Sequence, residues 1–368
     1  MIDIAARMNE WSREKEKQPL YAVTVLEIEG SAVRGQGASM GIAADRSLTG
    51  SVSGGCIEST VIDTVESLRS GASSRMISFC PTDDPLMEAV SPCGGTVRVF
   101  MYPYSRVVGA ALLSCRQAER VCAWGLIVEG PDHLKGLSFA LGLEGELVLS
   151  EPAEETAAEE RPAKNGPKAD LNTVELVSEL EKAPEKGTLM KIGNLQVFLQ
   201  KLSPAPHAVV VGGSHIGEAL TGILKSLNWK VTIVDPRADF APADRFRAAD
   251  AVYHQWPEEA FSKLGLIGPG ERSRPTAVAA ISHNEQIDDA GIAAGLEGEC
   301  FFLGVLGSRR TFGARIERLK ERGYHEQQLE RVHGPIGLNI GAETPEEIAL
   351  AIAAQMVQDY RRIKKTRQ

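Results

Sequence analysis

The chain has 368 residues, of which 43% are hydrophobic and 24% are charged, a composition typical of a soluble globular protein. With 40 Lys and Arg against 49 Asp and Glu, its formal net charge is −9, which argues against charge-driven binding to nucleic acid or to an anionic membrane. No stretch approaches the roughly 20 apolar residues of a membrane span, and the first residues lack the pattern of a signal peptide, so we expect a cytoplasmic protein.

The first part of the chain has the mixed helix and strand patterns of an α+β domain. Ile4, Met8 and Trp11 recur on one face of a helix expected over residues 2–16. No internal repeat is evident in the sequence. Strand-like runs follow the helix at residues 21–28, 40–44, 75–80, 96–102, 120–128 and 188–199.

Two glycine-rich loops lie among the early strands. The first loop, residues 30–37, contains Arg34, and the second, residues 50–55, ends in Gly54 and Gly55. Glycine permits the tight backbone turns that bring a loop close to a ligand.

A cysteine follows the second loop directly. Cys56 stands at the start of a helix expected over residues 56–68, where the helix N-terminus favours a thiolate. Glu58 lies one turn into that helix and could satisfy capping groups or act as an acceptor. Cys93 also adjoins a Gly-Gly pair, so the two cysteines could line one site as sulfur carriers or ligands. In the alternative interpretation, the glycines shape two tight turns and each cysteine fills a small space.

The cysteines do not predict a metal site. None of the six forms a C-x-x-C pair, and the set does not match a zinc-ribbon pattern, so no metal-binding residue is predicted. In a reducing cytoplasm, cysteines are expected to be reduced thiols, most of them small and buried.

The boundary between two domains is expected near residue 205. Residues 151–170 combine Glu, Ala, Pro and Lys with almost no large apolar side chains, which predicts a solvated acidic insertion. Strand patterns resume after it. We therefore expect an N-terminal α+β domain over residues 1–205 and a second domain over residues 206–368.

The second domain alternates short apolar strands with helices, which predicts a parallel sheet with helices on both faces, a Rossmann-like doubly wound α/β fold. The last helix is expected to begin at Thr344-Pro345, with Glu347 completing a capping box. Strands are expected at residues 208–211, 230–234, 250–254, 276–281 and 300–305, and helices ending near 227 and over 288–296 and 312–322.

The turn after the first of these strands resembles a dinucleotide fingerprint. Gly212, Ser214 and Gly217 fall at the three glycine positions of Gly-x-Gly-x-x-Gly. Asp235 ends the next strand, at a distance that fits a ribose acceptor. A phosphate would bind at the N-terminus of the following helix. One interpretation is that this turn binds NAD(P) or another nucleotide. However, Ser214 replaces the glycine that lets the backbone approach a pyrophosphate, so the alternative is a nucleotide-type fold that binds no dinucleotide.

A second candidate anion site follows the strand at 300–305. Ser308 or Thr311 can cap the helix that opens there. Arg309 and Arg310 add two guanidinium groups, which suit phosphate or carboxylate. The alternative is two exposed arginines that pair with acidic residues.

Two histidines are expected near the same edge of the sheet. His283 follows the strand at 276–281, and His333 precedes the capped last helix. Either imidazole could donate to a phosphate or act as an acid or base, and a purely structural donor is the alternative for each.

Taken in order, these motifs resemble the XdhC/CoxI family, the accessory factors of xanthine dehydrogenase and related molybdenum hydroxylases. The family's usual Gly-Ala-Gly-His fingerprint appears here as Gly-Gly-Ser-His, ending at His215. The runs that carry the resemblance are GSAVRGQGASM, GSVSGGCIE, SPCGGTVRVF, HAVVVGGSHIG, VTIVDPR, ISHN, LGSRRT and HGPIGLNIGAETPEEIA.

The resemblance implies a protein that binds the molybdenum cofactor, a pyranopterin with a phosphate and a dithiolene. It would support sulfuration of the cofactor with a cysteine desulfurase and insert it into apo xanthine dehydrogenase or a related molybdenum hydroxylase, as a homodimer. The anion sites would hold the phosphate, and Cys56 or Cys93 would handle sulfur. Such a protein is a chaperone more than an enzyme with turnover of its own.

Two other functions stay open from the sequence. An NAD(P)-dependent oxidoreductase could use the same fingerprint, but it needs a nicotinamide pocket and a proton-transfer residue, for which only His283 and His333 offer themselves. A scaffold that docks to the hydroxylase, with both pockets vestigial, is the third possibility, because a Rossmann-like fold alone does not decide function.

Overall fold

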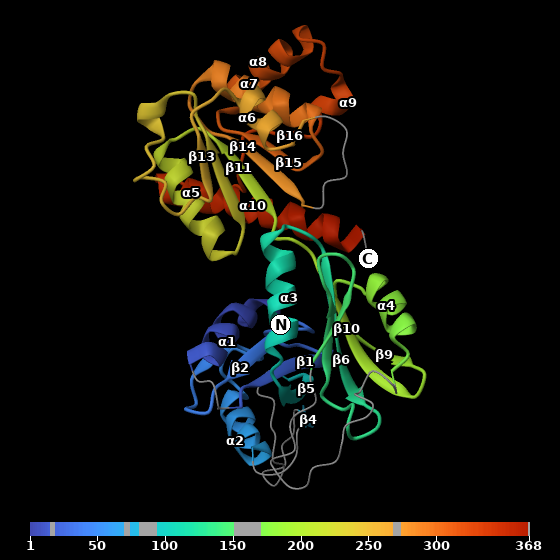
Figure 1. Ribbon diagram of the computed structural model, residues 1–368. Helices are drawn as coiled ribbons and strands as arrows, with labels where there is room; N and C mark the ends of the chain where they lie inside the picture. Colours follow the sequence, from blue (N-terminus) through green and yellow to red (C-terminus); the bar gives the residue numbers. More distant parts are fainter. Residues whose placement is uncertain (15–18, 70–73, 81–93, 151–170, 268–273, 367–368) are drawn as a thin grey trace. The chain divides into compact units, whose positions relative to one another are not determined.

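The computed structural model divides into two compact units, Met1–Pro204 and Ala205–Gln368, which are described separately (Figure 1). Cys93 and the predicted acidic insertion at 151–170 lie outside the described residues. Within the described ranges, no helix combines the length and apolar character needed to cross a membrane. The structure describes residues 1–14, 19–69, 74–80, 94–150, 171–267 and 274–366.

Within its described residues, the first unit contains two five-stranded antiparallel sheets and four helices. The first sheet has the order β3-β2-β1-β5-β4 and the second has the order β8-β7-β6-β10-β9. The helices are α1 (Ile2–Glu14), α2 (Glu58–Leu68), α3 (Arg106–Gln117) and α4 (Thr173–Glu181). The strands are β1 (Tyr21–Glu29), β2 (Ser39–Ile42), β3 (Leu48–Gly50), β4 (Arg75–Phe79), β5 (Thr96–Pro103), β6 (Cys122–Glu129), β7 (Ser138–Leu141), β8 (Leu147–Leu149), β9 (Thr188–Ile192) and β10 (Leu195–Leu202).

These elements form a structural repeat that the sequence does not reveal. Each half runs helix, three strands, helix, two strands, and the two sheets have the same strand order. The loops that join the first two strands of each half also correspond. The backbone N–H of Gly37 donates to Val25 O at 2.8 Å, and that of Gly136 donates to Ile127 O at 2.9 Å. A repeated topology needs only a repeated pattern of buried positions, so it can persist where residue identities do not.

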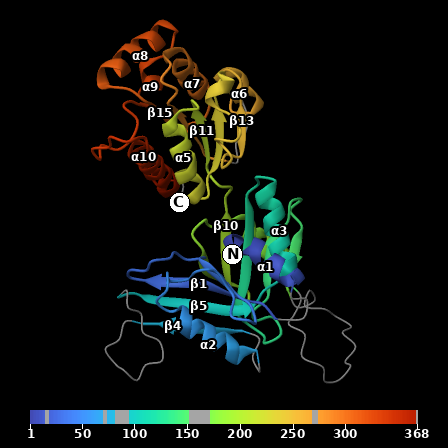
Figure 2. The same ribbon diagram turned by 90° about the vertical axis from the view of Figure 1, so that its left-hand side faces the viewer.

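The core of the first unit lies between its sheets and on their outer faces. Met8 of α1 and Leu112 of α3 pack with Phe100, Trp124 and Phe198 from the two sheets. Figure 2 shows α2 beside β5 and β4, where its apolar face covers the other side of the first sheet. The helix α4 covers the second sheet in the same way.

Most of the elements expected in the first unit are present, with two corrections. The helix expected at 2–16 is α1, and its predicted apolar face is buried. The run at 188–199 is two strands, because the chain turns at Gly193, which has a positive φ of 57°. The helix expected from Cys56 begins at Glu58, since the backbone before it is bonded to side chains of the preceding loop.

The second unit is a six-stranded parallel sheet, which confirms the expected Rossmann-like doubly wound fold. Its strand order is β13-β12-β11-β14-β15-β16. The strands are β11 (His207–Val211), β12 (Lys230–Val234), β13 (Ala251–Tyr253), β14 (Thr276–Ala280), β15 (Cys300–Val305) and β16 (Val332–His333). The helices are α5 (His215–Ser226), α6 (Pro257–Lys263), α7 (Glu285–Glu297), α8 (Arg309–Glu321), α9 (Glu326–Leu329) and α10 (Pro345–Thr366).

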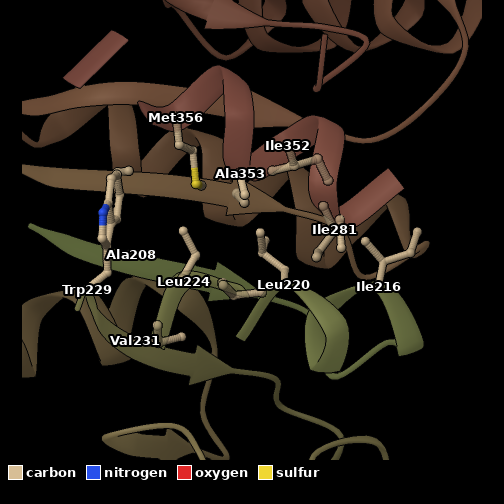
Figure 3. Packing of buried hydrophobic residues seen from close by; sticks show 14 of the residues in the cluster. Ala208, Ile216, Leu220, Leu224, Trp229, Val231, Ile281, Ile352, Ala353 and Met356 are labelled. Carbon is tan, nitrogen blue, oxygen red and sulfur yellow. The ribbon is translucent and has the colours of Figure 1, made fainter. Parts of the chain in front are cut away.

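Helices cover both faces of this sheet. Figure 3 shows Ile352 and Met356 of α10 close to Leu220 and Leu224 of α5, and these residues belong to one buried cluster with the strands. The helices α6, α7 and α8 contribute to a cluster on the opposite face. The predicted cap of α10 is confirmed, because the N–H of Glu347 donates to Thr344 Oγ1 at 3.3 Å and the Thr344 N–H donates to Glu347 Oε2 at 3.1 Å.

Candidate functional site

The turns that carry the predicted residues of the second unit lie at one edge of its sheet. The strands β11, β14 and β15 are neighbours and run parallel, so the turns after their carboxyl ends adjoin one another. Gly212 has a φ of +119°, and a Cβ placed there would clash with the backbone of Ser282. The fingerprint turn therefore touches the turn that carries His283, and only glycine fits at the contact.

The fingerprint turn is built around the start of α5. Ser214 is the N-cap of this helix, and its hydroxyl accepts from the N–H of Gly217 at 3.2 Å. A Cβ on Gly217 would lie 2.7 Å from Gly212 O, so this position also requires glycine. His215 is exposed in the first turn. The N–H groups of a helix's first turn have no acceptor within the helix, so those that the Ser214 hydroxyl does not bind are available to an anion.

The carboxylate of Asp235 is fully occupied by donors of its own chain. The residue is buried, and Oδ2 accepts from the N–H of Gly213 and from Arg237 Nη2, both at 2.8 Å. Oδ1 accepts from the N–H and Nε of Arg237, both at 2.9 Å. Burial raises the pKa of Asp235, but the bonds from Arg237 and Gly213 outweigh it and leave the pKa below its usual value. A carboxylate has about four acceptor positions, so a ribose hydroxyl would have to displace one of these donors.

Buried ion pairs join the turns after β14 and β15. Arg315 is 4% exposed, and its Nε donates to Asp289 Oδ1 at 2.5 Å. It also donates to Leu306 O at 3.3 Å and lies 3.6 Å from Asp288 Oδ2. The Oδ1 of Asp288 in turn accepts from the N–H and the hydroxyl of Ser282, at 2.8 and 2.7 Å. This network was not predicted from the sequence. The available signal was the pair Asp288 and Asp289 in one helix and Arg315 at a position of the next helix where an apolar residue would be expected.

The two candidate histidines have different environments. His283 is exposed, with a left-handed φ of 59°, and its neighbour Asn284 is fixed by a bond from its N–H to Ser282 Oγ at 3.1 Å. His333 instead lies 3.2 Å from Asp359 of α10 and stacks on Phe302 at 5.0 Å between ring centroids. His333 thus fastens α10 to the sheet, whereas His283 presents its imidazole at the edge.

The turn after β15 has the arrangement of a capped helix start. Ser308 is the N-cap of α8, and its hydroxyl accepts from the N–H of Thr311 at 3.2 Å. Arg309 and Arg310 follow it and are exposed, and neither forms a salt bridge with the residues that the structure describes. Two guanidinium groups are therefore available beside the first-turn N–H groups of this helix.

In the first unit, three glycine-rich segments meet at one end of the first sheet. A Cβ on Gly30 would lie 3.3 Å from the Cα of Gly95, and one on Gly54 would lie 3.2 Å from the side chain of Val33. Arg34 is exposed in the first of these loops. Because Cys93 lies outside the described residues, the predicted pairing of the two cysteines at one site stays a prediction.

The second glycine-rich loop is filled by the carboxylate of Glu58. Oε1 accepts from Ser51 Oγ at 2.7 Å and from the N–H groups of Ser53 and Gly54 at 3.0 and 3.1 Å. Oε2 accepts from Ser53 Oγ and from the N–H of Gly55 at 3.0 Å. Burial alone would raise the pKa of Glu58, but these bonds outweigh it and lower the pKa to about 2. The loop amides are thus bound to the chain's own anion.

The same loop holds Cys56 at the surface. Its N–H donates to Ser53 Oγ at 2.9 Å, and its side chain is exposed two residues before α2 begins. The described residues contain no group of three or more His, Cys, Asp or Glu side chains that could hold a metal ion. The loop therefore presents a thiol on a backbone fixed by hydrogen bonds, without a neighbouring metal centre of that kind.

Two family models match this chain. The model of the XdhC Rossmann domain matches residues 208–356, and that of the XdhC and CoxI family matches residues 14–79. A crystal structure described as a xanthine dehydrogenase from Bacillus halodurans has a TM-score of 0.70 and 21% identity, covering 98% of this chain and 96% of that one. At this identity, the likeness concerns the fold.

Three curated relatives are similar in sequence. The Escherichia coli protein YqeB is 29% identical over 45% of this chain, which spans only 29% of YqeB. A Bacillus subtilis protein described as a probable xanthine dehydrogenase subunit is 24% identical, over 95% of this chain and 96% of that protein. The molybdenum cofactor insertion chaperone PaoD of Escherichia coli is 21% identical, over 91% of this chain and 81% of PaoD.

Proposed function

The chain belongs to the XdhC and CoxI family, and from this premise we propose that it binds the molybdenum cofactor and inserts it into an apo molybdenum hydroxylase such as xanthine dehydrogenase. One observation carries the proposal. The turns after β11, β14 and β15 place two capped helix starts, His283 and the exposed Arg309 and Arg310 at one edge of a parallel sheet. Ligands of such sheets bind at this edge.

The phosphate of the cofactor is the group that this edge suits best. The first-turn N–H groups of α5 and α8 offer donors with the favourable end of a helix dipole. Arg309 and Arg310 add charge-assisted donors, and His283 adds an imidazole. Ser214 and Ser308 cap the helices and so fix these donors before the ligand arrives.

We assign the sulfuration step to Cys56. Its thiol is exposed on a loop fixed by Glu58 and Ser53, so a cysteine desulfurase can reach it without rearrangement of the backbone. The desulfurase, the apo-hydroxylase and a second copy of this chain are the partners of the proposed function. Cys93 stays a second candidate for the same step.

The arrangement at Asp235 disfavours the alternative of an NAD(P)-dependent oxidoreductase. Its carboxylate already accepts four hydrogen bonds, so the ribose hydroxyls lack the acceptor that a dinucleotide site provides. We expect no measurable NAD binding by calorimetry. Stoichiometric NAD binding that depends on Asp235 would favour the oxidoreductase.

The cofactor proposal is tested by uptake of molybdenum cofactor from a donor under anaerobic conditions. Replacing Arg309 and Arg310 together by Ala should weaken binding by about 1–3 kcal/mol, the value of charge-assisted hydrogen bonds. Arg322→Ala, at the far end of the same helix, is the matched control and should leave affinity unchanged. No uptake by the wild type, or equal affinity in the double variant, would refute the proposed site.

The sulfuration step has its own test. Cys56→Ala should leave cofactor binding intact but prevent activation of the apo-hydroxylase when cysteine desulfurase is the sulfur source. Ser59→Ala, an exposed neighbour, should activate like the wild type. Full activation by Cys56→Ala would remove this thiol from the mechanism while leaving the binding proposal standing.

A further inference from the structure

The first unit contains a pocket of about 250 Å³ whose lining includes two cysteines. Cys115 lies in the last turn of α3 and Cys122 is the first residue of β6. Leu141, Leu180 and Lys201 complete much of the wall. None of the residues assigned to the proposed cofactor site lines this pocket.

The chain brings these two thiols together through a tight turn. The N–H of Arg120 donates to Cys115 O at 2.9 Å, and Glu119 takes a left-handed φ of 58°. The chain then re-enters the second sheet at Cys122. The seven-residue spacing resembles no metal-binding motif, which is why the sequence predicted no metal-binding residue here.

Both thiols are buried and held only weakly. Cys115 is 1% exposed and Cys122 is 4% exposed. Their sulfur atoms make long contacts to carbonyl oxygens, at 3.7 Å to Leu141 and 3.8 Å to Leu202. Burial raises the pKa of both, that of Cys122 to about 12, and each sulfur is near enough to affect the pKa of the other. Without a ligand both thiols are therefore neutral, and no repulsion between thiolates keeps the two sulfur atoms apart.

We propose that Cys115 and Cys122 bind one soft monovalent metal ion of the Cu(I) class as a two-coordinate bis-thiolate. Thiolate ligands select soft ions, and a d10 monovalent ion is satisfied by two of them. Structural zinc needs four ligands, and calcium or magnesium needs oxygen donors. Among the described residues, no larger cluster of ligating side chains is present to serve those ions.

The charges around the pocket suit the product of this binding. One M⁺ ion forms two metal–sulfur bonds as each thiol loses its proton to solvent, which gives an M(SR)₂⁻ complex and two released protons without electron transfer. Arg120, Lys201 and Glu181 line the pocket, so the lining carries one net positive charge, and Nη1 of Arg120 donates to Leu143 O at 2.7 Å. This net charge offsets the single negative charge that the complex brings into the pocket.

The experiment is an anaerobic titration of the full chain with Ag(I) as a redox-inert probe, and with Cu(I) in competition with a coloured chelator. A Cys56→Ser background removes the exposed thiol. We expect one ion per chain, bound at least tenfold more weakly when Cys115 or Cys122 is also changed to Ser. Cys300→Ser, a buried cysteine of the second unit, is the matched control and should leave affinity unchanged.

Two further measurements test the site independently: the pH dependence of the affinity and the protection of the cysteines from alkylation. Release of two protons should raise the affinity about 100-fold for each pH unit in the neutral range. In the wild type, bound Ag(I) should protect Cys115 and Cys122 from alkylation during brief unfolding, which needs no variant to fold. Retention of the site in both serine variants, or protection of neither cysteine, would overturn the proposal. Replacing Arg309 and Arg310 together by Ala should not affect binding of the metal ion. A failure of the metal-site proposal can therefore be told apart from a failure of the proposed cofactor site.

Discussion

At the scale of single residues, two glycine-containing turns of this chain are occupied by the chain's own carboxylates. Glu58 fills the loop before α2, and Asp235 binds the amide of Gly213 beside the fingerprint. A glycine-rich turn therefore does not by itself indicate a free anion site. The amides left for a ligand are those in the first turns of α5 and α8, which is why the proposed site is placed there.

Replacing Glu58 by Gln tests the stabilising effect of its ionised carboxylate. The pKa of Glu58 is about 2 in the folded protein, against an ordinary 4.5. The ionised form is therefore favoured by folding, and its contribution is complete above pH 4.5 and is lost as the pH falls toward 2. We expect Glu58→Gln to lower the free energy of unfolding by about 1 kcal/mol at pH 7, a figure reduced for solvent exposure.

Urea unfolding at pH 7 and pH 3 measures this effect. The difference between Glu58→Gln and the wild type should shrink at pH 3, because the carboxyl of the unfolded chain, with its ordinary pKa of 4.5, is then mostly protonated and folding no longer gains the full benefit of the low folded-state pKa. Glu66→Gln in the same helix is the control, since its ion pair with Arg46 is exposed. A difference that stays constant with pH would show that the carboxylate charge is not what stabilises the loop.

The two histidines should respond in opposite ways to substitution. His283→Gly removes a side chain from a left-handed backbone, so the free energy of unfolding should rise by up to about 1 kcal/mol. Binding of a phosphate ester should weaken. His333→Gln should instead cost about 1 kcal/mol of stability through loss of the Asp359 and Phe302 contacts, with binding unchanged. Chemical unfolding and calorimetry measure both, and the reverse pattern would exchange their assigned roles.

At the scale of elements, the ion pairs of Arg315 hold α7, α8 and the turns before them in one arrangement. Arg315→Leu would leave the buried Asp288 without its counter-charge, so we expect a loss of about 3–5 kcal/mol at pH 7. Burial already raises the pKa of Asp288, and the loss should narrow as the pH falls and the carboxyl takes up a proton.

Denaturant unfolding at pH 7 and pH 5 measures this loss. Arg309→Leu is the matched control on the same helix, where exposure predicts a change within about 0.5 kcal/mol. If Arg315→Leu cost no more than that control, the network would not be what holds the two turns together.

Elements with a strong local signal were predictable from the sequence. The cap and apolar face of α10 and the glycines around α5 each follow from residues adjacent in the chain. The remaining contacts depend on where each strand lies in the sheet, so they could not be predicted from the sequence. The meeting of Gly212 with Ser282 and the bond from the Gly213 N–H to Asp235 depend on contacts between segments distant in the sequence, which no local pattern encodes.

At the scale of the whole molecule, the repeat in the first unit separates scaffold from site. Both halves share strand order and the glycine turn between their first two strands. In the first half, the segment before its second helix carries the Ser51 to Glu58 bonds and the exposed Cys56. The sulfuration site proposed in this unit thus lies on a loop of a repeated framework, which agrees with sites being added to folds without change in their cores.

The two units should also be separable in practice. The second unit has its own buried hydrophobic clusters on both faces of its sheet, and Pro204 and Pro206 flank the boundary. A fragment of residues 205–368 should therefore fold cooperatively, with a free energy of unfolding of about 5–15 kcal/mol. Because α5, α8 and His283 all belong to it, the fragment should bind a phosphate ester as tightly as the full chain does.

Denaturant unfolding tests whether the fragment folds, and calorimetry tests whether it binds the ester. The fragment carrying Arg309→Ala and Arg310→Ala is the control for specific binding. A folded fragment that binds the ester at least tenfold more weakly than the full chain would mean that the first unit supplies part of the anion site, and the assignment of the phosphate to the sheet edge alone would then be wrong.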